Sequence, residues 1–362
     1  MYKGQTFVYR SVEDIKQDVD AARALAEELK AASWRLGLGG RIDNAVLGAV
    51  VNGNPELYHR DSSDPGDLEP RLHSLANVAN WLASDGRTAF LQDADGLIMR
   101  THELLEVLGY LKSSLPSIER VTSYGRAKTA ARKSLEELKL LHRAGLSRLH
   151  VGLESGADEV LQYVDKGVTA EEHINGGRKV VDAGISLSEY VMPGLGGRRW
   201  SEKHALESAR VLNEIAPDFI RLRSLMVGPL CPLHEQVASG DFEPLSEDET
   251  VVEIRLFLEN LDCNAYVASD QMVNLLWEME GQLPQDKQAM LDVIDSYLSK
   301  SPMERLRFCL ERRRRSFFSV YGGFPSEVQV QVQRAADAID SGAPDAAEKV
   351  KAAIDILKQS FI

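Results

Sequence analysis

The strongest constraint on the fold is a regular recurrence of short apolar segments, each ending in a polar or glycine-rich stretch. Five such ends fall near residues 95, 123, 154, 192 and 226, a spacing close to the roughly 30 residues that one βαβ unit needs. A helix-like segment follows each of them. Strands that alternate with helices predict a parallel sheet. In (β/α) barrels the carboxyl ends of the strands carry the active site, so the polar ends are where we expect chemistry.

The intervening helices are predicted from their N-terminal capping patterns. In each, a serine or threonine is followed three residues later by an acidic residue, which is typical of a helix start. The first predicted helix also repeats apolar residues at three- and four-residue steps from Val12 to Leu29, which gives it one apolar face. The capping pairs are Ser11 with Asp14, Ser134 with Glu137, Thr169 with Glu172, and Ser246 with Glu249.

These patterns divide the chain into three predicted regions. We expect a partial (β/α) barrel over residues 1–265, interrupted by short helical pieces between residues 41 and 86. Helical patterns dominate after residue 265, which predicts a helical extension over 266–325. The stretch Gly322-Gly323-Phe324-Pro325 then separates a helical tail over 326–362, because glycine and proline interrupt helices.

The composition is that of an ordinary globular protein. Of the residues, 44% are hydrophobic and 27% are charged. No apolar run approaches the roughly 20 residues that cross a bilayer, and the N-terminus does not have the pattern of a signal peptide. Three scattered cysteines fit a reducing compartment better than a disulfide framework. These features predict a cytoplasmic protein without membrane contact.

The charge balance argues against a nucleic-acid partner. The formal net charge is −13, and binding of nucleic acids depends largely on neutralising phosphates with Lys and Arg. The basic run Arg312–Arg315 is the local exception. We interpret it as a solvated helix end, with RNA contact as the less supported alternative.

Four of the strand ends resemble, in order and spacing, those of radical S-adenosylmethionine (SAM) proteins. The resemblance extends over about the first 300 residues, to the core that elongator-type acetyltransferases, methylthiotransferases and nitrogenase-cofactor proteins share with oxygen-independent coproporphyrinogen oxidases. It implies a (β/α) barrel that lacks its first strand here. The segments that carry it are Phe90–Asp95, Arg120–Arg126, Leu149–Gly156 and Tyr190–Gly197.

The resemblance also implies a cofactor whose ligands this sequence does not contain. In that family a C-x-x-x-C-x-x-C loop after the first strand binds a [4Fe–4S] cluster, and SAM chelates the open iron. In related sequences Met-Tyr-Lys-Gly follows the last of these cysteines. This chain begins with the same four residues, so we expect the loop to belong to an upstream segment. Cys231, Cys263 and Cys309 are too far apart to form such a loop, and we assign no metal ligand in this chain.

The resemblance implies a set of SAM-binding residues at the strand ends. Acidic side chains and carbonyls suit the SAM ammonium, and glycines let backbone approach a ligand closely. For each side chain the alternative is a structural role, in an acidic turn, a helix cap or a glycine turn. The predicted set is Asp93, Asp95, Ser123, Arg126, Glu154, Ser155, Gly194, Gly196 and Arg221.

Two arginines on one predicted strand need anionic partners. Arg221 and Arg223 alternate with apolar neighbours, so they share one face of the strand. The partner is the SAM carboxylate, an acidic substrate, or a carboxylate of the protein in a structural salt bridge. The segment Ser269-Asp270-Gln271, with Asn274, is a further candidate on the substrate side.

The resemblance predicts an enzyme that cleaves SAM reductively, forms a 5′-deoxyadenosyl radical and abstracts hydrogen from an unidentified, small-molecule or other substrate. Flavodoxin or ferredoxin would be the electron donor. One alternative is a cluster-less barrel that binds SAM or a nucleotide in a regulatory role. Another is an unrelated (β/α)-barrel enzyme with acid–base chemistry at Glu154 and the pair Asp93 and Asp95.

Overall fold

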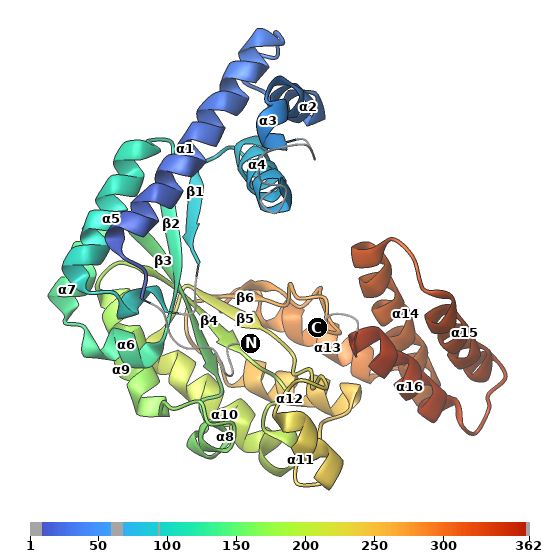
Figure 1. The fold of residues 1–362 in the computed structure, drawn as a ribbon. Coiled ribbons are helices and arrows are strands. Elements are labelled where there is room, and N and C mark those ends of the chain that lie inside the picture. Colours follow the sequence, from blue (N-terminus) through green and yellow to red (C-terminus); the bar gives the residue numbers. More distant parts are fainter. Residues whose placement is uncertain (1–8, 59–67, 93–94, 360–362) are drawn as a thin grey trace. The chain divides into compact units, whose positions relative to one another are not determined.

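The chain is an α/β protein with a mostly parallel seven-stranded sheet and a helical C-terminal region, as predicted (Figure 1). A computed structural model describes residues 9–58, 68–92 and 95–359. Two compact units share these residues. The first extends to Tyr124 and includes Glu136–Arg148, and the second comprises Gly125–Leu135 and everything from Leu149 onward. Within the described ranges, no helix is both long and apolar enough to cross a membrane.

The first unit contains a helical cluster and two parallel strands. Strand β1 pairs in parallel with β2, with Leu91 opposite Ser123. A buried cluster that includes Leu29, Val46, Tyr58 and Leu75 joins four of the helices. They are the short pieces expected between residues 41 and 86 and the long helix that precedes them. The elements are α1 (Val12–Arg35), α2 (Asn44–Gly53), α3 (Pro55–Tyr58), α4 (Leu68–Ala83), β1 (Thr88–Leu91), the 3-10 helix η2 (Gly96–Ile98), α5 (Thr101–Ser114), β2 (Arg120–Gly125) and α7 (Leu135–Arg143).

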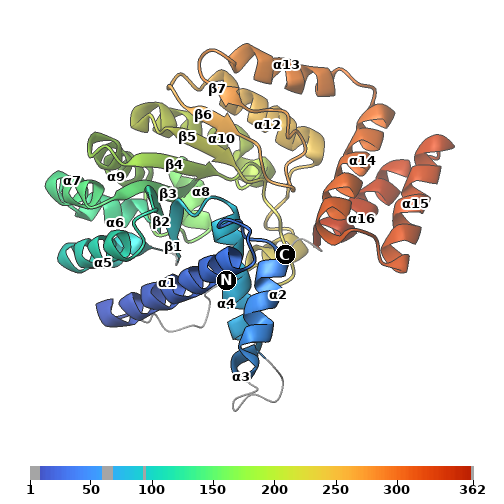
Figure 2. The same ribbon diagram turned by 90° about the horizontal axis from the view of Figure 1, so that it is seen from above.

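The second unit holds most of the predicted strand ends. Strands β4, β5 and β6 pair in parallel, and β7 is antiparallel to β6. Helices α9, α10 and α12 lie along one side of these strands (Figure 2). The elements are α6 (Ala127–Arg132), β3 (Leu146–Glu154, which begins in the first unit), α8 (Asp158–Tyr163), α9 (Ala170–Asp182), β4 (Ser186–Val191), α10 (Gly197–Ile215), β5 (Phe219–Leu222), α11 (Leu233–Ser239), α12 (Glu247–Glu259), β6 (Tyr266–Ala268), β7 (Gly281–Gln282), α13 (Lys287–Leu298), α14 (Pro302–Tyr321), α15 (Ser326–Asp340) and α16 (Ala346–Gln359).

The capping patterns located all four helix starts correctly, since α1, α7, α9 and α12 begin directly after Ser11, Ser134, Thr169 and Ser246. Reciprocal capping boxes form at Ser11, Thr169 and Ser246. A fourth box, at Ser301 with Glu304, starts α14 and was not predicted. Capping therefore explains why α1, α9, α12 and α14 begin where they do, since each box satisfies backbone amides that the first turn leaves unpaired.

The sheet continues beyond the barrel region predicted from the sequence. Strand β6 begins at Tyr266 and β7 lies at Gly281–Gln282, inside the stretch expected to be a helical extension. Strands of three and two residues are too short to show an alternating pattern. The domain limits at residues 265 and 325 remain a prediction, although the break before the tail does coincide with the end of α14 at Tyr321.

The solvated interpretation of the basic run is wrong for its first two residues. Arg312 and Arg313 are buried. Arg312 pairs with Glu278 at 2.6 Å and lies over the Trp277 ring, while Arg313 pairs with Glu247 at 2.7 Å. Buried arginines are retained where carboxylates neutralise them. Here they connect α14 to the rest of the second unit.

Candidate functional site

Two of the predicted site residues in the first unit pack against backbone, and a third cannot be placed. Asp93 lies outside the described residues. Asp95 starts the η2 turn, where its carbonyl accepts the amide of Ile98 at 3.1 Å. Ser123 is buried and donates its hydroxyl to the carbonyl of Tyr124 at 3.0 Å. A Cβ on Gly96 would lie only 2.3 Å from the Ser123 hydroxyl oxygen, so glycine allows this turn to pack on the end of β2.

The end of β3 has an unusual backbone at Glu154. Its φ angle is +60°, and the amide of Ser155 donates to the carbonyl of Leu153 at 2.7 Å. This three-residue γ-turn is rare and strained for a residue with a side chain, with a typical cost of about 1–3 kcal/mol. Such strain is concentrated at functional sites. It makes Glu154 the strongest candidate for function among the predicted residues.

The side chain of Glu154 forms an ion pair that the sequence did not reveal. Its Oε1 lies 3.2 Å from Nζ of Lys166, and both side chains are partly exposed. The guanidinium of Arg126 donates to the Lys166 carbonyl at 3.0 Å. The structure therefore brings two predicted residues, Arg126 and Glu154, together around Lys166 at one strand end of the second unit. An adjacent ammonium and carboxylate complement a ligand that carries both charges.

Glycine at position 152 leaves the space that this ion pair occupies. A Cβ there would lie 2.3 Å from Oε1 of Glu154 and 3.2 Å from Nζ of Lys166. The first distance is shorter than any normal carbon–oxygen contact, so a side chain at this position would displace the charged groups. Gly152 thus contributes to the site because its lack of a side chain leaves room for the two charged groups.

We expect Gly152→Ala to move the Glu154 carboxylate without unfolding the protein, because both groups it would meet are the ends of flexible side chains. The melting temperature should stay within a few degrees of the wild type, which for a domain of this size corresponds to roughly 1 kcal/mol. Binding of a ligand to the ion pair should weaken several-fold. Isothermal titration calorimetry with SAM checks the second effect, and thermal unfolding checks the first.

Ser155 is directed away from the strand end, into the protein. It is fully buried. Its hydroxyl accepts the amide of Ala157 at 3.1 Å and contacts Nδ1 of His204, on α10, at 2.8 Å. The adjacent amide of Gly156 donates to the Ser208 hydroxyl at 2.8 Å. These contacts hold the loop after β3 against α10. None of them tests the role in SAM binding that the sequence predicts for Ser155.

The glycine-rich turn after β4 is also held from within. Gly194 has a φ of +87°, which favours glycine, and its amide donates to Oε1 of Glu253 at 2.6 Å. Gly196 precedes the first residue of α10. Glu253 is buried on α12, and desolvation raises the pKa of its carboxyl to about 7 although the Ser201 hydroxyl and the Gly194 amide act in the opposite direction.

A second group of charged residues lies on β5 and just after the ends of β5 and β6. Tyr190 and Arg221 are register partners and so share a face of the sheet. Asp270 accepts a hydrogen bond from Arg223 at 2.7 Å and lies 3.4 Å from Arg221. One of the three partners expected for the two arginines is therefore present in the protein itself. It is the carboxylate of Asp270, in the segment after β6. Arg223 also lies over the ring of Tyr190, whose hydroxyl contacts Nδ1 of His150 at 3.0 Å.

One buried carboxyl, that of Glu189 on β4, lacks a well-formed hydrogen bond within the described part of the chain. Both side-chain oxygens of Glu189 are buried without one. Burial, reinforced by the charge of Glu154, raises its pKa well above the ordinary value, against the opposing influence of Lys166 and the Leu153 backbone. A buried carboxyl held neutral beside an ion-paired carboxylate is a pattern found at acid–base sites.

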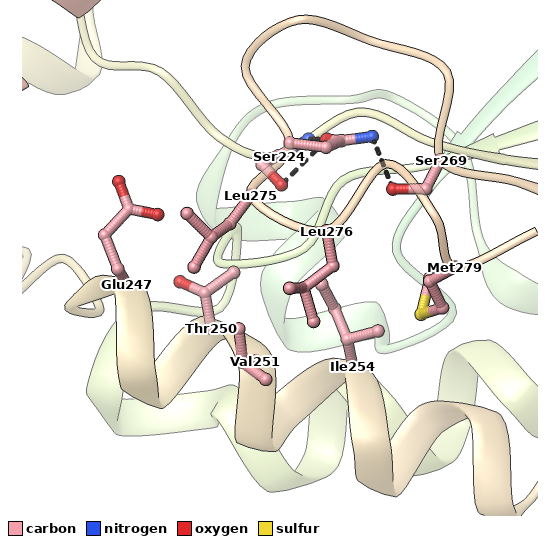
Figure 3. A pocket seen from close by; sticks show the side chains of 10 residues that line it. Ser224, Glu247, Thr250, Val251, Ile254, Ser269, Leu275, Leu276 and Met279 are labelled. Carbon is pink, nitrogen blue, oxygen red and sulfur yellow. Dashed lines mark hydrogen bonds between the residues drawn. The ribbon is translucent and has the colours of Figure 1, made fainter. Parts of the chain in front are cut away.

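The segment after β6 serves as structural support. Asn274 accepts from the amide and hydroxyl of Ser224 at 3.0 and 2.9 Å, and donates to the Leu222 carbonyl and the Ser269 hydroxyl. Figure 3 shows Ser224 and Ser269 at the polar end of a small pocket, with apolar side chains such as Ile254 and Leu276 below them. The pocket is too small for a substrate, and Asn274 uses its polar atoms to join the ends of β5 and β6.

The cysteines in the described ranges do not fit an iron–sulfur cluster. Burial raises the pKa of the Cys263 thiol to about 11 and that of Cys309 to about 12, whereas cluster ligands are thiolates. Across residues 9–58, 68–92 and 95–359 no group of three or more His, Cys, Asp or Glu side chains is arranged to hold a metal ion. The described strand ends therefore carry charged and polar side chains, but within those ranges no ligand set for a cluster.

The sequence did not reveal Lys166, His204 or Glu253, which hold the site residues in place. Lys166 follows the short helix α8, and His204 and Glu253 lie within amphipathic helices, where a charged or polar residue normally faces solvent. A signal was present for Glu253, since it follows Glu249 of the capping box by one helical turn and so lies on the same side of α12. No comparable pattern marks Lys166.

Comparison with known proteins gives two curated relatives of similar sequence. Both are named tRNA uridine(34) acetyltransferase. The one from Methanocaldococcus jannaschii is 23% identical over 117 residues, and the one from Methanocaldococcus infernus is 24% identical over 119. These matches cover 32% and 33% of this chain and 22% of each relative. The similar part therefore spans about a fifth of the length of the curated relatives.

Solved structures with a partial likeness include Methanocaldococcus infernus Elp3 lacking residues 1–46, at 16% identity and a TM-score of 0.41 over 51% of this chain and 49% of that one. Methylornithine synthase (PylB) has 12% identity and a TM-score of 0.35, over 75% and 83% of the two chains. HydG, a maturase of the [FeFe]-hydrogenase, has 14% identity and a TM-score of 0.36, over 95% and 92%.

A family model matches the part of the chain that holds four of the predicted strand ends. Residues 85–209 match the radical SAM superfamily. This span runs from β1 into α10, and includes the strained turn at Glu154, Lys166 and the Gly194 turn. The resemblance of the four strand ends is thereby confirmed: residues 85–209, about a third of the chain, are similar to the radical SAM superfamily.

Proposed function

We propose that the second unit binds SAM at the ends of β3, β4 and β5, as the SAM-binding part of a radical SAM enzyme that acts on an unidentified substrate. The observation that carries the proposal is the Glu154–Lys166 pair, which a strained turn presents beside a glycine that leaves room for it. The matched family supports SAM as the ligand.

Each charged group in the proposed site has a complementary group on SAM. The Lys166 ammonium suits the SAM carboxylate, and the Glu154 carboxylate suits the SAM ammonium or the ribose hydroxyls. Arg221 and Arg223 outnumber their shared partner Asp270, so one positive charge is left for the ligand's carboxylate or for an acidic group of the substrate. The glycine turn at Gly194 and Gly196 allows the adenosine to approach the backbone.

The radical step needs a [4Fe–4S] cluster, which would supply the electron that cleaves SAM. The described cysteines do not fit that role, so we assign this chain's residues to SAM binding and orientation only. In the proposed enzyme the cluster ligands and a donor such as flavodoxin or ferredoxin are supplied from outside these residues. The acetyltransferase named in the two relatives does not define the substrate, because the similarity reaches only 22% of their length.

Replacing either partner of the ion pair should weaken SAM binding. We expect Glu154→Gln and Lys166→Ala each to raise the dissociation constant about tenfold or more, since a charge-assisted hydrogen bond contributes roughly 1.5–3 kcal/mol. Isothermal titration calorimetry under anaerobic conditions measures this.

The matched controls are Glu159→Gln and Lys203→Ala, which change the same residue types in an exposed ion pair on α8 and α10. They should bind SAM like the wild type. Absence of SAM binding by the wild-type chain, or equal losses in controls and site variants, would refute the proposal. If a form that carries the cysteine loop bound SAM but released no 5′-deoxyadenosine on reduction, the regulatory alternative would be favoured.

A further inference from the structure

Helix α10 is the common support of the loops that follow β3 and β4. A Cβ at Gly156 would lie 2.3 Å from the carbonyl oxygen of Glu207, and one at Gly196 would lie 2.9 Å from that of Trp200. Both of these oxygens belong to the backbone of α10, which cannot move aside easily. Each loop therefore touches the helix backbone directly, and glycine is required at both contacts.

His204 of α10 links the two loops through a single ring. Its Nδ1 contacts the Ser155 hydroxyl at 2.8 Å, and the ring also hydrogen-bonds the backbone of Met192, at the end of β4. Since Nδ1 faces the Ser155 hydroxyl, we assign the ring proton to Nε2, from which the Met192 carbonyl would accept it. Nδ1 then accepts the Ser155 proton, and the Ser155 oxygen remains available to accept the amide of Ala157. Every donor in this arrangement has an acceptor.

Glu253 of α12 holds the second loop. Its Oε1 accepts the Gly194 amide at 2.6 Å, and its Oε2 accepts the Ser201 hydroxyl at 2.5 Å. Oε1 also lies 3.7 Å from Nε2 of His204, which is contact without a hydrogen bond. One carboxyl thus fixes the glycine turn in its left-handed conformation and joins it to the first turns of α10.

These groups are too deeply buried to touch a ligand. Ser155, His204 and Glu253 are at most 3% exposed. A buried polar network is costly unless each member is satisfied, and when satisfied it specifies one geometry. An apolar core would stabilise the loops without fixing where their backbones lie. The network therefore has the properties expected of a device that sets loop positions.

We propose that His204 and Glu253 are positioning residues for SAM: His204 sets the spacing between the Glu154 loop and the Gly194 turn, and Glu253 sets the conformation of that turn. This inference rests on the proposed function, which places SAM against both loops. Neither residue contacts the ligand, so each acts through the backbone that it holds.

The positioning by Glu253 depends on its protonation. An ionised carboxylate accepts the Gly194 amide more strongly than a neutral carboxyl does, so the turn is held more firmly as the pH rises through about 7. The titratable group facing Glu253 is His204, whose pKa burial lowers to about 4. His204 is therefore neutral throughout this range, and Ser201 and the Gly194 backbone supply the remaining contacts.

The first experiment measures amide hydrogen exchange and needs no ligand. In His204→Ala we expect faster exchange in both loops, residues 153–157 and 192–197, whereas in Glu253→Gln the change should be confined to the second. The matched control is Leu212→Ala, which removes an equally buried apolar side chain about two turns further along α10. It should lower the melting temperature and leave loop exchange close to the wild type. Equal effects of His204→Ala and Leu212→Ala would overturn the proposal.

The second experiment measures the SAM dissociation constant between pH 6 and 8. The wild type should bind SAM about as tightly as Glu253→Gln at pH 6 and roughly three- to tenfold more tightly at pH 8, since a charge-assisted hydrogen bond is about twice as strong as a neutral one. The SAM amine titrates in this range as well, but equally for both proteins, so the ratio isolates Glu253. His204→Ala should weaken binding about tenfold at every pH.

The two experiments separate the failure of each idea. If the wild type binds no SAM at any pH, the proposed function and the role of the network in SAM binding both fall. If SAM binds but its affinity in Glu253→Gln follows the wild type at every pH, the proposed function stands and the positioning role of Glu253 is overturned. If His204→Ala binds SAM as Leu212→Ala does, the positioning role of His204 is overturned.

Discussion

Replacing Arg313 with alanine should cost about 3 kcal/mol or more of unfolding free energy, because removing one partner of a buried ion pair typically costs 3–5 kcal/mol. Arg313 on α14 is 1% exposed and bonds both carboxylate oxygens of Glu247 on α12, at 2.8 and 2.7 Å. It also donates to the carbonyl of Val273 at 2.6 Å. The truncation leaves the Val273 carbonyl without this donor, and the Glu247 carboxylate keeps Lys358, on α16, as its remaining cation in the described part of the chain.

The pKa of Glu247 shows how strongly Arg313 stabilises the ionised carboxylate. Burial alone would raise the pKa of the carboxyl, but the charges of Arg313 and Lys358 outweigh it and lower the pKa to about 2. Much of that stabilisation disappears with Arg313. Lys358 is partly exposed, so its share is screened by solvent and cannot replace the buried guanidinium.

Urea unfolding measures the loss, and Arg314→Ala is its control. Arg314 is the next residue along α14, and its side chain is 41% exposed and paired with Glu311 one turn away. Surface pairs of this kind contribute roughly 0–1 kcal/mol. A similar loss from Arg313→Ala and Arg314→Ala would contradict the prediction, because it would mean that the buried pair contributes no more than an exposed one.

The fold class could be predicted because strand and helix signals agreed along most of the chain. The segments that end at Leu91, Glu154 and Val191 are long enough, and apolar enough, to be recognised as strands. Strand β6 has only three residues, and its place in the sheet depends on pairing with β5 rather than on its own pattern.

The candidate site was predicted in part, for a related physical reason. Resemblance predicted Glu154, Gly194 and Arg221 because ligand-facing groups lie at strand ends in a fixed order, and their role in binding stays a prediction. What holds these groups in place comes from elsewhere in the chain: Lys166 follows α8, and Asp270 follows β6. Contacts between residues distant in sequence are fixed by packing, which a single sequence does not reveal.

The same limit explains why Arg313 and Glu253 were missed or misread. A run of four arginines normally indicates a solvated surface, and a glutamate inside a helix normally faces water. Each is buried here because a partner on another helix or loop compensates for it. Exposure is a property of the packed structure, so charge patterns alone assign it wrongly where buried networks exist.

The buried carboxyls should also make the protein less stable as the pH rises from mildly acidic to neutral. The pKa of Glu253 is raised from 4.5 in the unfolded chain to about 7 in the folded protein. Its contribution to stability is therefore fully present below pH 4.5 and is lost as the pH rises to 7, when the unfolded state releases its proton first. About 2.5 pH units at about 1.4 kcal/mol each give a loss of roughly 3 kcal/mol.

Glu189 also makes the protein less stable as the pH rises above about 4.5, because burial raises its pKa well above the ordinary value. We expect Glu253→Gln and Glu189→Gln each to flatten the dependence of unfolding free energy on pH, since an amide cannot ionise. Urea unfolding at half-unit steps from pH 4.5 to 8 measures the slope.

Exposed carboxylates in ion pairs, such as Glu159, have lowered pKa values and oppose the trend, so Glu159→Gln should steepen the loss slightly or leave it unchanged. If Glu253→Gln lost stability with pH as steeply as the wild type, the carboxyl would have to be ionised in the folded protein throughout, and its hold on the Gly194 turn would not vary with pH.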